Sequence, residues 1–535
     1  MKKRIRTAPI ILFLSMACLI ILIVSVHSAQ KEEVDIGQLI RDYNSLLTEK
    51  KKTGSDLSAA EMLDHQSREA MAQGNPGLAA MLLEDAIRIL KDPLAGLSSD
   101  SLESNSFSSS DFKTVSTVVI DDISWRSPFG IFGPYQFALD SKKIMNRQKI
   151  NAYLTDLGVK WVQEMPVGIK NVPPSIGIYS RVGREGGVRP PGIDYDAYKG
   201  ALRKTIERFK NRVKYWEVDT EPGGFGPPKG WKGHEEEYAI FLKETYGVIK
   251  NECPDCMVVL GGTAGIAGGR REDSNAVFVR KILDYGAGQN FDVFSFKLHH
   301  HKVSDYVDLK NKMEIYERIF SDRNLDLKKK SIFLETGIYD GNPKYLPGHP
   351  LSFIHLPSQT EFQQAAGLVK TYVYAIAHGV NRIFWNEVLE RHNFGGEKHN
   401  PFNYYGLVNN PLNEDGKSHK KLAYYTYKKM VEVLEGSDWK NLVTVRDEGG
   451  IFIYKFNRQG KMIIVAWNDG NEESDIRIPG LKSSKIRITY AVPDKPSGLE
   501  VQDYRTSFKT FTVNVQENAI RMSIRDNPVY VEEIK

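Results

Sequence analysis

Cysteine is scarce in this chain of 535 residues, which contains three. Cys18 lies in an apolar run near the amino terminus, and the other two cysteines belong to the tetrapeptide CPDC at positions 253–256. A structural zinc site uses four ligands, which one cysteine pair does not supply. Cys253 and Cys256 therefore form either a disulfide within a loop or two free thiols.

A marked excess of one charge is also missing, because the formal net charge is +5. Four of the basic residues, Lys2, Lys3, Arg4 and Arg6, precede the apolar run, and subtracting them from +5 leaves +1 for the rest. This balance provides no basic footprint for nucleic acid, and we expect no nucleic-acid partner.

The amino-terminal 29 residues resemble a targeting segment. Their basic residues are followed by an apolar run at 8–26, an order typical of a secretory signal or a membrane anchor. The run is longer than the usual signal core of about 7–15 residues and close to the shortest bilayer span. We interpret residues 1–29 as a signal peptide or anchor and favour the uncleaved anchor. The protein is then exported, and either held at the membrane by this segment or secreted after cleavage.

A helical region and a linker follow. Apolar residues recur at helical spacing at 36, 39, 40, 43 and 46, and again at 78, 82, 86 and 89. This spacing predicts a helical hairpin or stalk over residues 30–96. Serine occupies eight of the thirteen positions from 98 to 110, a composition that buries too little apolar surface to order itself. We therefore assign residues 97–113 to a linker.

The next part of the chain alternates short β-rich runs with amphipathic helical stretches. The runs are SPFGIFG (127–133), VKWVQ (159–163), SIGIYS (175–180), RVKYWEV (212–218), MVVLGG (257–262), FDVFSF (291–296), SIFLE (331–335) and VNRIFW (380–385). Eight such units predict an α/β fold, a (β/α)₈ TIM barrel, over residues 114–438. Active sites in this fold lie at the carboxyl ends of the strands, where Glu221 and Glu335 follow the fourth and seventh runs.

Beyond the barrel the periodicity changes to two. The segment GIFIYKFNRQGKMIIVAWNDGN (450–471) alternates apolar and polar residues around a turn, which predicts a hairpin. We expect a carboxyl-terminal β-sandwich over residues 439–535. The strand-like TVSTVVI (114–120) is a candidate for an additional strand of that sandwich.

Five segments carry a resemblance to a known group of enzymes. They are VKYWEVDTEP (213–222), FDVFSFKLHH (291–300), IFLETG (332–337), RIFWNEV (382–388) and YYGLVNNP (404–411). In this order and spacing they resemble the clan A retaining glycoside hydrolases. The similarity covers roughly residues 115–535 and is greatest to the family 39 group of xylosidases, iduronidases and exopolysaccharide endoglycosidases.

The resemblance implies that Glu221 is the acid/base and Glu335 the nucleophile of a retaining glycosidase acting on a polysaccharide or oligosaccharide, with no cofactor. Such a reaction needs one protonated and one ionised carboxyl group about 5–5.5 Å apart. Glu217 and Asp219 precede Glu221 on nominally the same strand face, and we expect them to be structural. Asn386-Glu387 is an alternative acid/base pair, although no proline follows it.

The resemblance also implies sugar contacts, some of them altered in this chain. Thr220 stands where an asparagine usually contacts the sugar 2-hydroxyl, Gln163 where the second strand often ends in arginine, and Lys297 where the sixth strand usually carries histidine. A cationic Lys297 near Glu335 would keep that carboxylate ionised. Adjacent side chains of an extended segment point in alternating directions, so His299, His300 and His301 do not readily share a metal ion. We expect the substrate contacts to come from Gln163, Thr220, Trp231, Lys297, His299, Trp385 and Tyr405.

These departures leave a second hypothesis open. A hydrogen bond to the 2-hydroxyl strengthens in the transition state, and its loss removes several kcal/mol of stabilisation. The chain is therefore either a glycosidase for a substrate that differs at this position, or a carbohydrate-binding protein of the cell envelope that kept the barrel and lost turnover.

Overall fold

The computed structural model describes residues 36–52, 64, 67–68, 71, 83, 86–87, 90, 127–135, 147–183, 192–224, 230–263, 274–345, 354–394, 397–413, 418–470 and 472–534. The predicted leader (1–29), the serine-rich linker (97–113) and the strand candidate at 114–120 lie outside this set. Among the described residues, no helix has both the length and the apolar character needed to span a bilayer. The chain divides into two units, Met1–Val115 and Ser116–Lys535.

The first unit is helical where it is described. Helix α2 (Ile36–Lys52) has the predicted amphipathic spacing, and Tyr43 on it is buried in a cluster with Leu83, Ala86, Ile87 and Leu90. Because these residues come from two separate helical segments, the predicted helical character of this region is confirmed.

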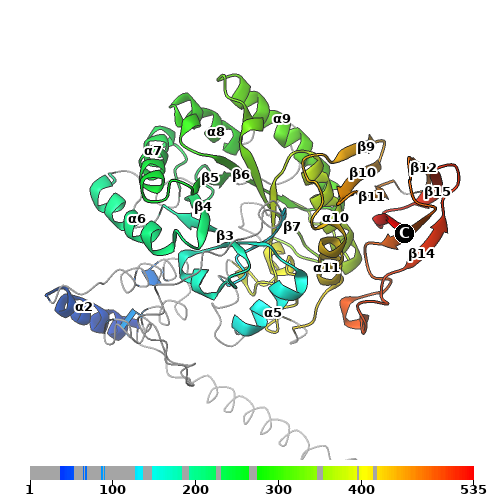
Figure 1. Ribbon diagram of the computed structural model, residues 1–535. Helices are drawn as coiled ribbons and strands as arrows, with labels where there is room; N and C mark the ends of the chain where they lie inside the picture. Colours follow the sequence, from blue (N-terminus) through cyan, green and yellow to red (C-terminus); the bar gives the residue numbers. More distant parts are fainter. Residues whose placement is uncertain are drawn as a thin grey trace, which may run out of the picture. The chain divides into compact units, whose positions relative to one another are not determined.

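The second unit contains a closed barrel of eight parallel strands in chain order (Figure 1). The strands are β1 (Phe129–Phe132), β2 (Trp161–Glu164), β3 (Gly177–Val182), β4 (Val213–Val218), β5 (Met257–Thr263), β6 (Val293–His300), β7 (Ser331–Ile338) and β8 (Arg382–Trp385). Strand β1 pairs with both β2 and β8, which closes the cylinder. The TIM-barrel prediction is confirmed, with each strand at its predicted run.

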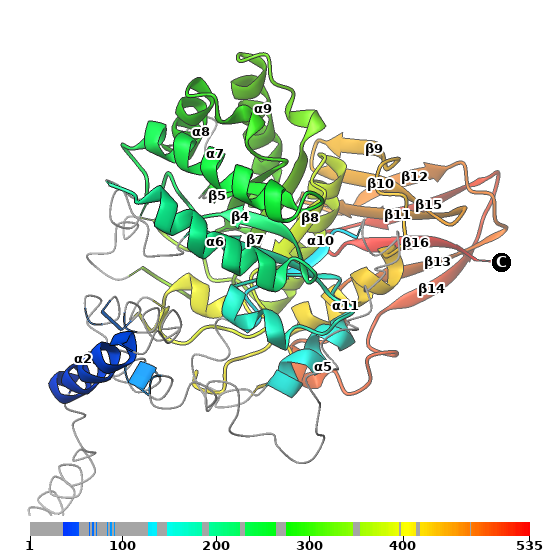
Figure 2. The same ribbon diagram turned by 60° about the vertical axis from the view of Figure 1, so that its left-hand side comes forward.

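Helices surround the barrel on its outer side (Figures 1 and 2). The α-helices are α5 (Arg147–Leu157), α6 (Tyr195–Phe209), α7 (Glu235–Glu252), α8 (Ser274–Asp284), α9 (Asp308–Ser321), α10 (Glu361–Ala377) and α11 (Leu422–Leu434). Short 3₁₀ helices are η4 (Pro166–Asn171), η6 (Ala287–Gln289), η7 (Val303–Val307), η8 (Leu327–Lys329), η10 (Pro401–Tyr404) and η11 (Gly498–Glu500). Apolar faces of the helices bury against the strands in one continuous core.

The interior of the barrel is filled mainly by aromatic side chains. Phe132, Trp161, Tyr179, Tyr215, Val259, Val293, Phe333 and Phe384 form this separate inner cluster. The guanidinium of Arg382 lies 4.3 Å from the centre of the Trp161 ring and 4.7 Å from that of Tyr215, a favourable cation–π arrangement. The barrel is therefore a packed core and not an open channel.

The carboxyl-terminal part is a β-sandwich, as predicted. Its strands are β9 (Val443–Glu448), β10 (Ile451–Arg458), β11 (Lys461–Asn468), β12 (Ser474–Pro479), β13 (Lys485–Tyr490), β14 (Thr510–Asn514), β15 (Ala519–Ile524) and β16 (Val529–Ile534). Six strands form one antiparallel sheet in the order β14-β13-β16-β11-β10-β9, and β12 pairs with β15. Residues of both sheets share an isoleucine-rich core, and β10 and β11 form the predicted hairpin.

The sandwich packs on the side of the barrel that carries α10 (Figure 2). Trp467 Nε1 donates a hydrogen bond to Tyr306 Oη over 2.8 Å, and Tyr306 also bonds Asp469. Lys370 of α10 lies 2.7 Å from Asp469 Oδ1. Buried aromatic and ionic contacts of this kind join the two domains.

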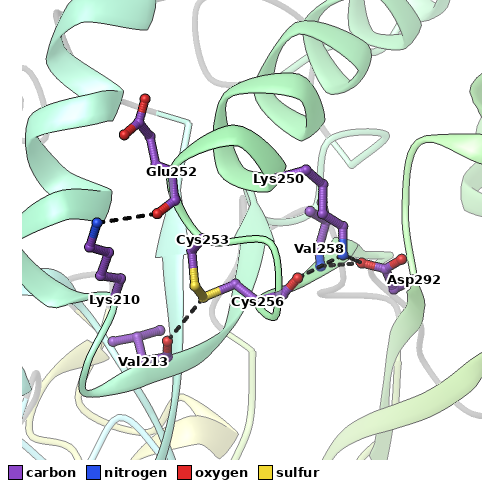
Figure 3. Close-up of a disulfide and its surroundings, with 8 residues drawn as sticks. All are labelled: Lys210, Val213, Lys250, Glu252, Cys253, Cys256, Val258 and Asp292. Carbon is purple, nitrogen blue, oxygen red and sulfur yellow. Dashed lines mark hydrogen bonds and ion pairs between the residues drawn. A yellow bond between two sulfur atoms is a disulfide. The ribbon is translucent and has the colours of Figure 1, made fainter.

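Cys253 and Cys256 form a disulfide between the end of α7 and the start of β5 (Figure 3). Lys250 Nζ donates to the Cys256 carbonyl over 2.7 Å and lies 2.8 Å from Asp292 Oδ2. Of the two alternatives that the sequence leaves open, the structure has the disulfide. The disulfide lies at the end of the barrel where the strands begin, opposite the carboxyl ends of the strands.

Candidate active site

The site begins with the turn that follows β4. The strand ends at Val218, and both Asp219 and Glu221 have positive φ angles, 61° and 46°. Such angles are uncommon for residues other than glycine. Backbone bonds hold the turn, because Asp219 N donates to Val182 O over 2.7 Å and Glu221 N to Gly262 O over 2.9 Å. The strand alternation therefore stops before Asp219, and the turn sets the position of Glu221.

The Asp219 side chain fixes this turn from within. It is buried, accepts a hydrogen bond from Thr220 N over 2.8 Å, and accepts another from Trp231 Nε1 over 2.9 Å. The Trp231 indole is 1% exposed and stacks on Phe241 with ring centres 4.8 Å apart. The prediction that Trp231 contacts the substrate is corrected, because its ring is buried against Phe241 and Tyr238 and its N–H is bonded to Asp219.

Glu335 lies on β7, buried, among side chains from both neighbouring strands. Lys297 Nζ of β6 lies 2.9 Å from Glu335 Oε2, and Asn386 Nδ2, just after β8, donates to Oε1 over 3.3 Å. His299 Nε2 lies 3.7 Å from Oε1. Burial raises the pKa of Glu335, the Lys297 ammonium opposes that rise, and the charge of Glu221 adds to it.

Lys297 also contacts the other candidate carboxylate. Its Nζ lies 3.3 Å from Glu221 Oε1, so the two contacted oxygens of Glu221 and Glu335 are at most 6.2 Å apart, the sum of 3.3 and 2.9 Å. Burial would lower the pKa of Lys297, but the two carboxylates outweigh it and the pKa is raised. The structure therefore brings Glu221, Glu335 and Lys297 together at the end of the barrel where the strands finish.

A second layer of charged and polar side chains, centred on Glu217, lies on the barrel-interior side of Glu221, Glu335 and Lys297. Gln163 Nε2 donates to Glu217 Oε2 over 2.8 Å, Arg181 Nε to the same oxygen over 3.2 Å, and Gly262 N to Oε1 over 2.8 Å. Glu217 is thus paired within the barrel, as expected. Arg181 of β3 places a guanidinium beside Glu217; burial lowers the pKa of Arg181, but Glu217 and Glu335 raise it overall.

The three consecutive histidines point to different partners. His299 stacks on Tyr405 with ring centres 5.6 Å apart, and burial followed by the Lys297 charge lowers its pKa well below the ordinary value. His300 Nε2 lies 3.1 Å from Thr336 Oγ1, and His301 contacts the Tyr345 ring. Among the residues that the structure describes, no group of three or more side chains is arranged to hold a metal ion.

Two further predicted sugar contacts are buried. The Trp385 indole is 0% exposed and faces Tyr372 of α10, whereas the preceding Phe384 points into the barrel. The prediction that Trp385 contacts the substrate is therefore corrected. Tyr405 is likewise buried, and it acts on the site through the His299 ring that it supports.

The loop after β8 contributes residues that the sequence analysis did not place near Glu335. Arg391 Nη2 donates to Asn386 Oδ1 over 3.1 Å and Arg391 pairs with Glu387. Burial raises the pKa of Glu387 to about 8 against the opposing effect of Arg391. The Asn-Glu dipeptide at 386–387 was the available signal, but we interpreted it only as an alternative acid/base. Asn386 is the member that contacts Glu335.

Several buried polar atoms near the two glutamates have no hydrogen-bond partner among the described residues. They are Thr220 Oγ1, Gln163 Oε1 and His299 Nδ1. Buried polar atoms are generally satisfied in folded proteins.

No known protein family and no curated protein sequence matches this chain. Solved structures do match its fold. A family 39 glycoside hydrolase from Bacteroides cellulosilyticus WH2 aligns with a TM-score of 0.52 and 16% identity over 76% of this chain and 81% of that chain. An α-L-arabinofuranosidase from Thermotoga maritima aligns with a TM-score of 0.52 and 11% identity over 77% and 97%. A family 51 α-L-arabinofuranosidase from Bifidobacterium longum gives 0.51 and 12% over 76% and 96%. The fold of this chain is therefore similar to that of clan A glycoside hydrolases.

Proposed function

We propose that the protein is a retaining glycoside hydrolase that acts on a polysaccharide or oligosaccharide outside the cytoplasm. The observation that carries the proposal is that Glu221 Oε1 and Glu335 Oε2, the two oxygens that Lys297 contacts, lie at most 6.2 Å apart. Retaining enzymes hold their two carboxyl groups about 5–5.5 Å apart, whereas inverting enzymes hold them about 6.5–9.5 Å apart to admit a water molecule. The solved structures with a similar fold are described as glycoside hydrolases or arabinofuranosidases, which supports this proposal.

In this mechanism Glu335 attacks the anomeric carbon while Glu221 donates its proton to the departing glycosidic oxygen. A covalent glycosyl ester on Glu335 results, and the leaving group departs as an alcohol. Water then attacks the anomeric carbon, Glu221 takes a proton from the water, and the bond between the anomeric carbon and Glu335 breaks, which releases the sugar and the Glu335 carboxylate. The contacts of Glu335 with Lys297 and Asn386 favour its ionised form, which the attack requires.

The observed environment also suggests where the sugar binds. Thr220 Oγ1 and Gln163 Oε1 are enclosed and have no partner in the described part of the chain, and we assign both to sugar hydroxyl groups that reach them when ligand binding opens the site. The 2-hydroxyl contact falls to Thr220, whose single hydroxyl both donates and accepts. Trp231 and Trp385 are not part of this assignment, because both indoles are packed in the protein core.

A second candidate function is a carbohydrate-binding protein without turnover. One observation favours it, because Lys297 Nζ lies between the two carboxylates, and a substrate has to displace this ammonium before the reaction begins. The two functions make different demands on Lys297: a hydrolase needs its contact with Glu221 to open, whereas a binding protein does not.

Hydrolysis of a broad panel of 4-nitrophenyl glycosides and purified polysaccharides tests the proposal. We expect turnover of at least one glycan, with the first product in the same anomeric configuration as the substrate by ¹H NMR, and severe loss in Glu335→Gln. Trp467→Phe serves as the control, since it changes a buried residue of the sandwich. Inversion would refute the retaining mechanism, and binding without hydrolysis of any glycan would favour the second function.

A further inference from the structure

The Glu335 carboxylate is held at both of its oxygens. Lys297 Nζ lies 2.9 Å from Oε2, and Asn386 Nδ2 donates a hydrogen bond to Oε1 over 3.3 Å. His299 Nε2 lies 3.7 Å from Oε1, which is beyond hydrogen-bond distance. Because a planar carboxylate with a contact at each oxygen has a defined orientation, the direction of Glu335 depends on Asn386 as well as on Lys297.

The side-chain amide of Asn386 has two different ends. Its oxygen only accepts hydrogen bonds and its nitrogen only donates them, and the torsion that exchanges the two ends is broad and roughly two-fold. The backbone of Asn386 is fixed beside β7, since its N–H donates to Thr336 O over 2.9 Å, but this bond leaves the side-chain torsion free. An ionised Glu335 also only accepts, so it binds the nitrogen end of the amide and repels the oxygen end.

Arg391 decides which end of the amide faces Glu335. Its Nη2 donates to Asn386 Oδ1 over 3.1 Å, and a guanidinium has donors but no acceptor. The oxygen end is therefore held at Arg391, and the nitrogen end is directed to Glu335. Asn386 and Arg391 are 1% and 7% exposed, so bulk water competes little for either bond.

Arg391 is itself fixed by its surroundings. It forms a buried ion pair with Glu387, and its guanidinium carbon lies 4.4 Å from the centre of the Phe394 ring and 5.3 Å from that of Phe402. These are favourable cation–π distances. The planar guanidinium can bond Glu387 and Asn386 at the same time because its donors lie in a rigid fork.

We propose that Arg391 is a positioning residue for the nucleophile: it fixes the Asn386 amide, which in turn orients the Glu335 carboxylate for attack on the anomeric carbon. Arg391 acts through Asn386 and transfers no proton. This inference rests on the proposed hydrolase function, to which it adds a residue of the loop after β8.

Two substitutions of Arg391 separate this role from the ion pair with Glu387. Arg391→Met removes both contacts, whereas Arg391→Lys keeps a positive charge beside Glu387 but not the second donor that bonds Asn386. We expect both variants to lower kcat/KM by about 10- to 100-fold, because a displacement of about 1 Å at the reacting group has an effect of this order. Arg391→Lys should recover part of the unfolding free energy that Arg391→Met loses. Full recovery of kcat/KM in Arg391→Lys would show that the charge alone suffices, and it would overturn the proposal.

The choice of substrate identifies the group through which Arg391 acts. A natural glycan and a 4-nitrophenyl glycoside of the same sugar both need the nucleophile, whereas the glycan alone needs the acid, so the loss should be similar on the two substrates. A loss confined to the glycan would mean that Arg391 acts through Glu221, and it would overturn the proposal. Lys370→Met is the matched control, since it removes a buried cation paired with Asp469 and should leave kcat/KM unchanged.

A double-mutant cycle tests the link between Arg391 and Asn386. Asn386→Ala should lower kcat/KM by about 10- to 100-fold. Adding Arg391→Met to Asn386→Ala should then lower the unfolding free energy further but not kcat/KM, because residues that act in one network have non-additive effects. Losses in kcat/KM that multiply would show that the two residues act independently, which would overturn the proposal.

A last measurement needs no substrate. The full-length protein is labelled with [¹⁵N]asparagine, and the side-chain NH₂ signals of Asn386 are assigned by their loss in Asn386→Ala. We expect Arg391→Lys to shift these signals and to speed the exchange of their hydrogens with solvent, and Arg391→Met to do the same if it folds. Lys370→Met should change neither. Unchanged signals overturn the role of Arg391 even if hydrolysis is present. Shifted signals without hydrolysis of any glycan instead refute the proposed function and leave the bond between Arg391 and Asn386 established.

Discussion

Replacing Trp231 by phenylalanine tests whether the turn after β4 sets the position of the acid. Phenylalanine keeps most of the packing on Phe241 and removes one hydrogen bond, the 2.9 Å bond from the indole N–H to buried Asp219. Asp219 and Glu221 both have positive φ angles. The change therefore weakens the support of the turn without touching Glu221 itself.

The size of the effect follows from these contacts. A hydrogen bond to a charged group contributes about 1.5–3 kcal/mol, and a non-glycine residue in an unfavourable backbone region costs about 1–3 kcal/mol. Because the two quantities are similar, losing the bond allows the turn to relax. A displacement of about 1 Å reduces catalysis on the order of 10²-fold. We expect kcat/KM for a natural glycan to fall by about 10- to 100-fold.

The assay compares two substrates of the same sugar. A natural glycan has a poor leaving group and needs the acid, whereas a 4-nitrophenyl glycoside leaves readily without it, so Trp231→Phe should affect the glycan much more. Trp467→Phe is the matched control because it removes the 2.8 Å indole bond to Tyr306 in the sandwich. Equal losses on both substrates, or the same pattern in the control, would refute the reasoning.

Four further predictions follow from particular contacts. Glu221→Gln should slow hydrolysis of a natural glycan by about 10²- to 10⁴-fold; an unchanged rate would remove Glu221 from the acid role. Lys421→Met leaves two buried carboxylates without their shared ammonium. It should lower the free energy of unfolding, measured in urea, by about 3–5 kcal/mol, and a decrease below about 1 kcal/mol would contradict this. Replacing Cys253 and Cys256 by alanine opens a short loop and should cost about 2 kcal/mol with kcat/KM unchanged, since the disulfide lies at the opposite end of the barrel. The pKa of Glu387 is raised from 4.5 to about 8 in the folded protein, so its contribution to stability is complete below pH 4.5 and is lost as the pH rises through about 8. Glu387→Gln should therefore flatten the pH dependence of the unfolding free energy over this range. Parallel curves for the two proteins would contradict this prediction.

The barrel and its two central carboxylates could be predicted because their signals are local. Each strand is a short apolar run between helical stretches, and a residue at the end of a parallel strand lies at the same end of the barrel as all the others. Glu221 and Glu335 meet this condition although 114 residues separate them in the chain. The fold class therefore places both at one end of the barrel, and the turn after β4 sets how near Glu221 comes to Glu335.

The direction of individual side chains was harder to predict. Trp385 ends a strand, but the preceding Phe384 points into the barrel and Trp385 therefore points to α10. Whether the odd-numbered or the even-numbered residues of a strand face the barrel interior depends on the register between strands. The sequence of one strand does not determine it. Trp231 comes from a loop, where no periodicity indicates direction, and its partner Asp219 is visible only once the turn is built.

Contacts between strands account for the remaining differences. Lys297 pairs in register with Glu335 across β6 and β7, and Arg181 with Glu217 across β3 and β4. The resemblance implies that Lys297 stands where a histidine is usual, yet the same ammonium reaches Glu221 only because the turn after β4, held by Val182 and Gly262, places that carboxylate beside it. A contact of this kind depends on three structural elements together. The sequence of any one of these elements therefore does not predict it.

Trapping the covalent intermediate tests the central claim most directly. A 2-deoxy-2-fluoro glycoside with an activated leaving group, made from the sugar that the hydrolysis panel identifies, is incubated with the protein, and the labelled peptide is located by mass spectrometry. The account predicts one adduct per chain, on Glu335, absent in Glu335→Gln. An adduct on Glu217 or Glu387 instead, or steady hydrolysis that proceeds with inversion and leaves no adduct, would contradict it.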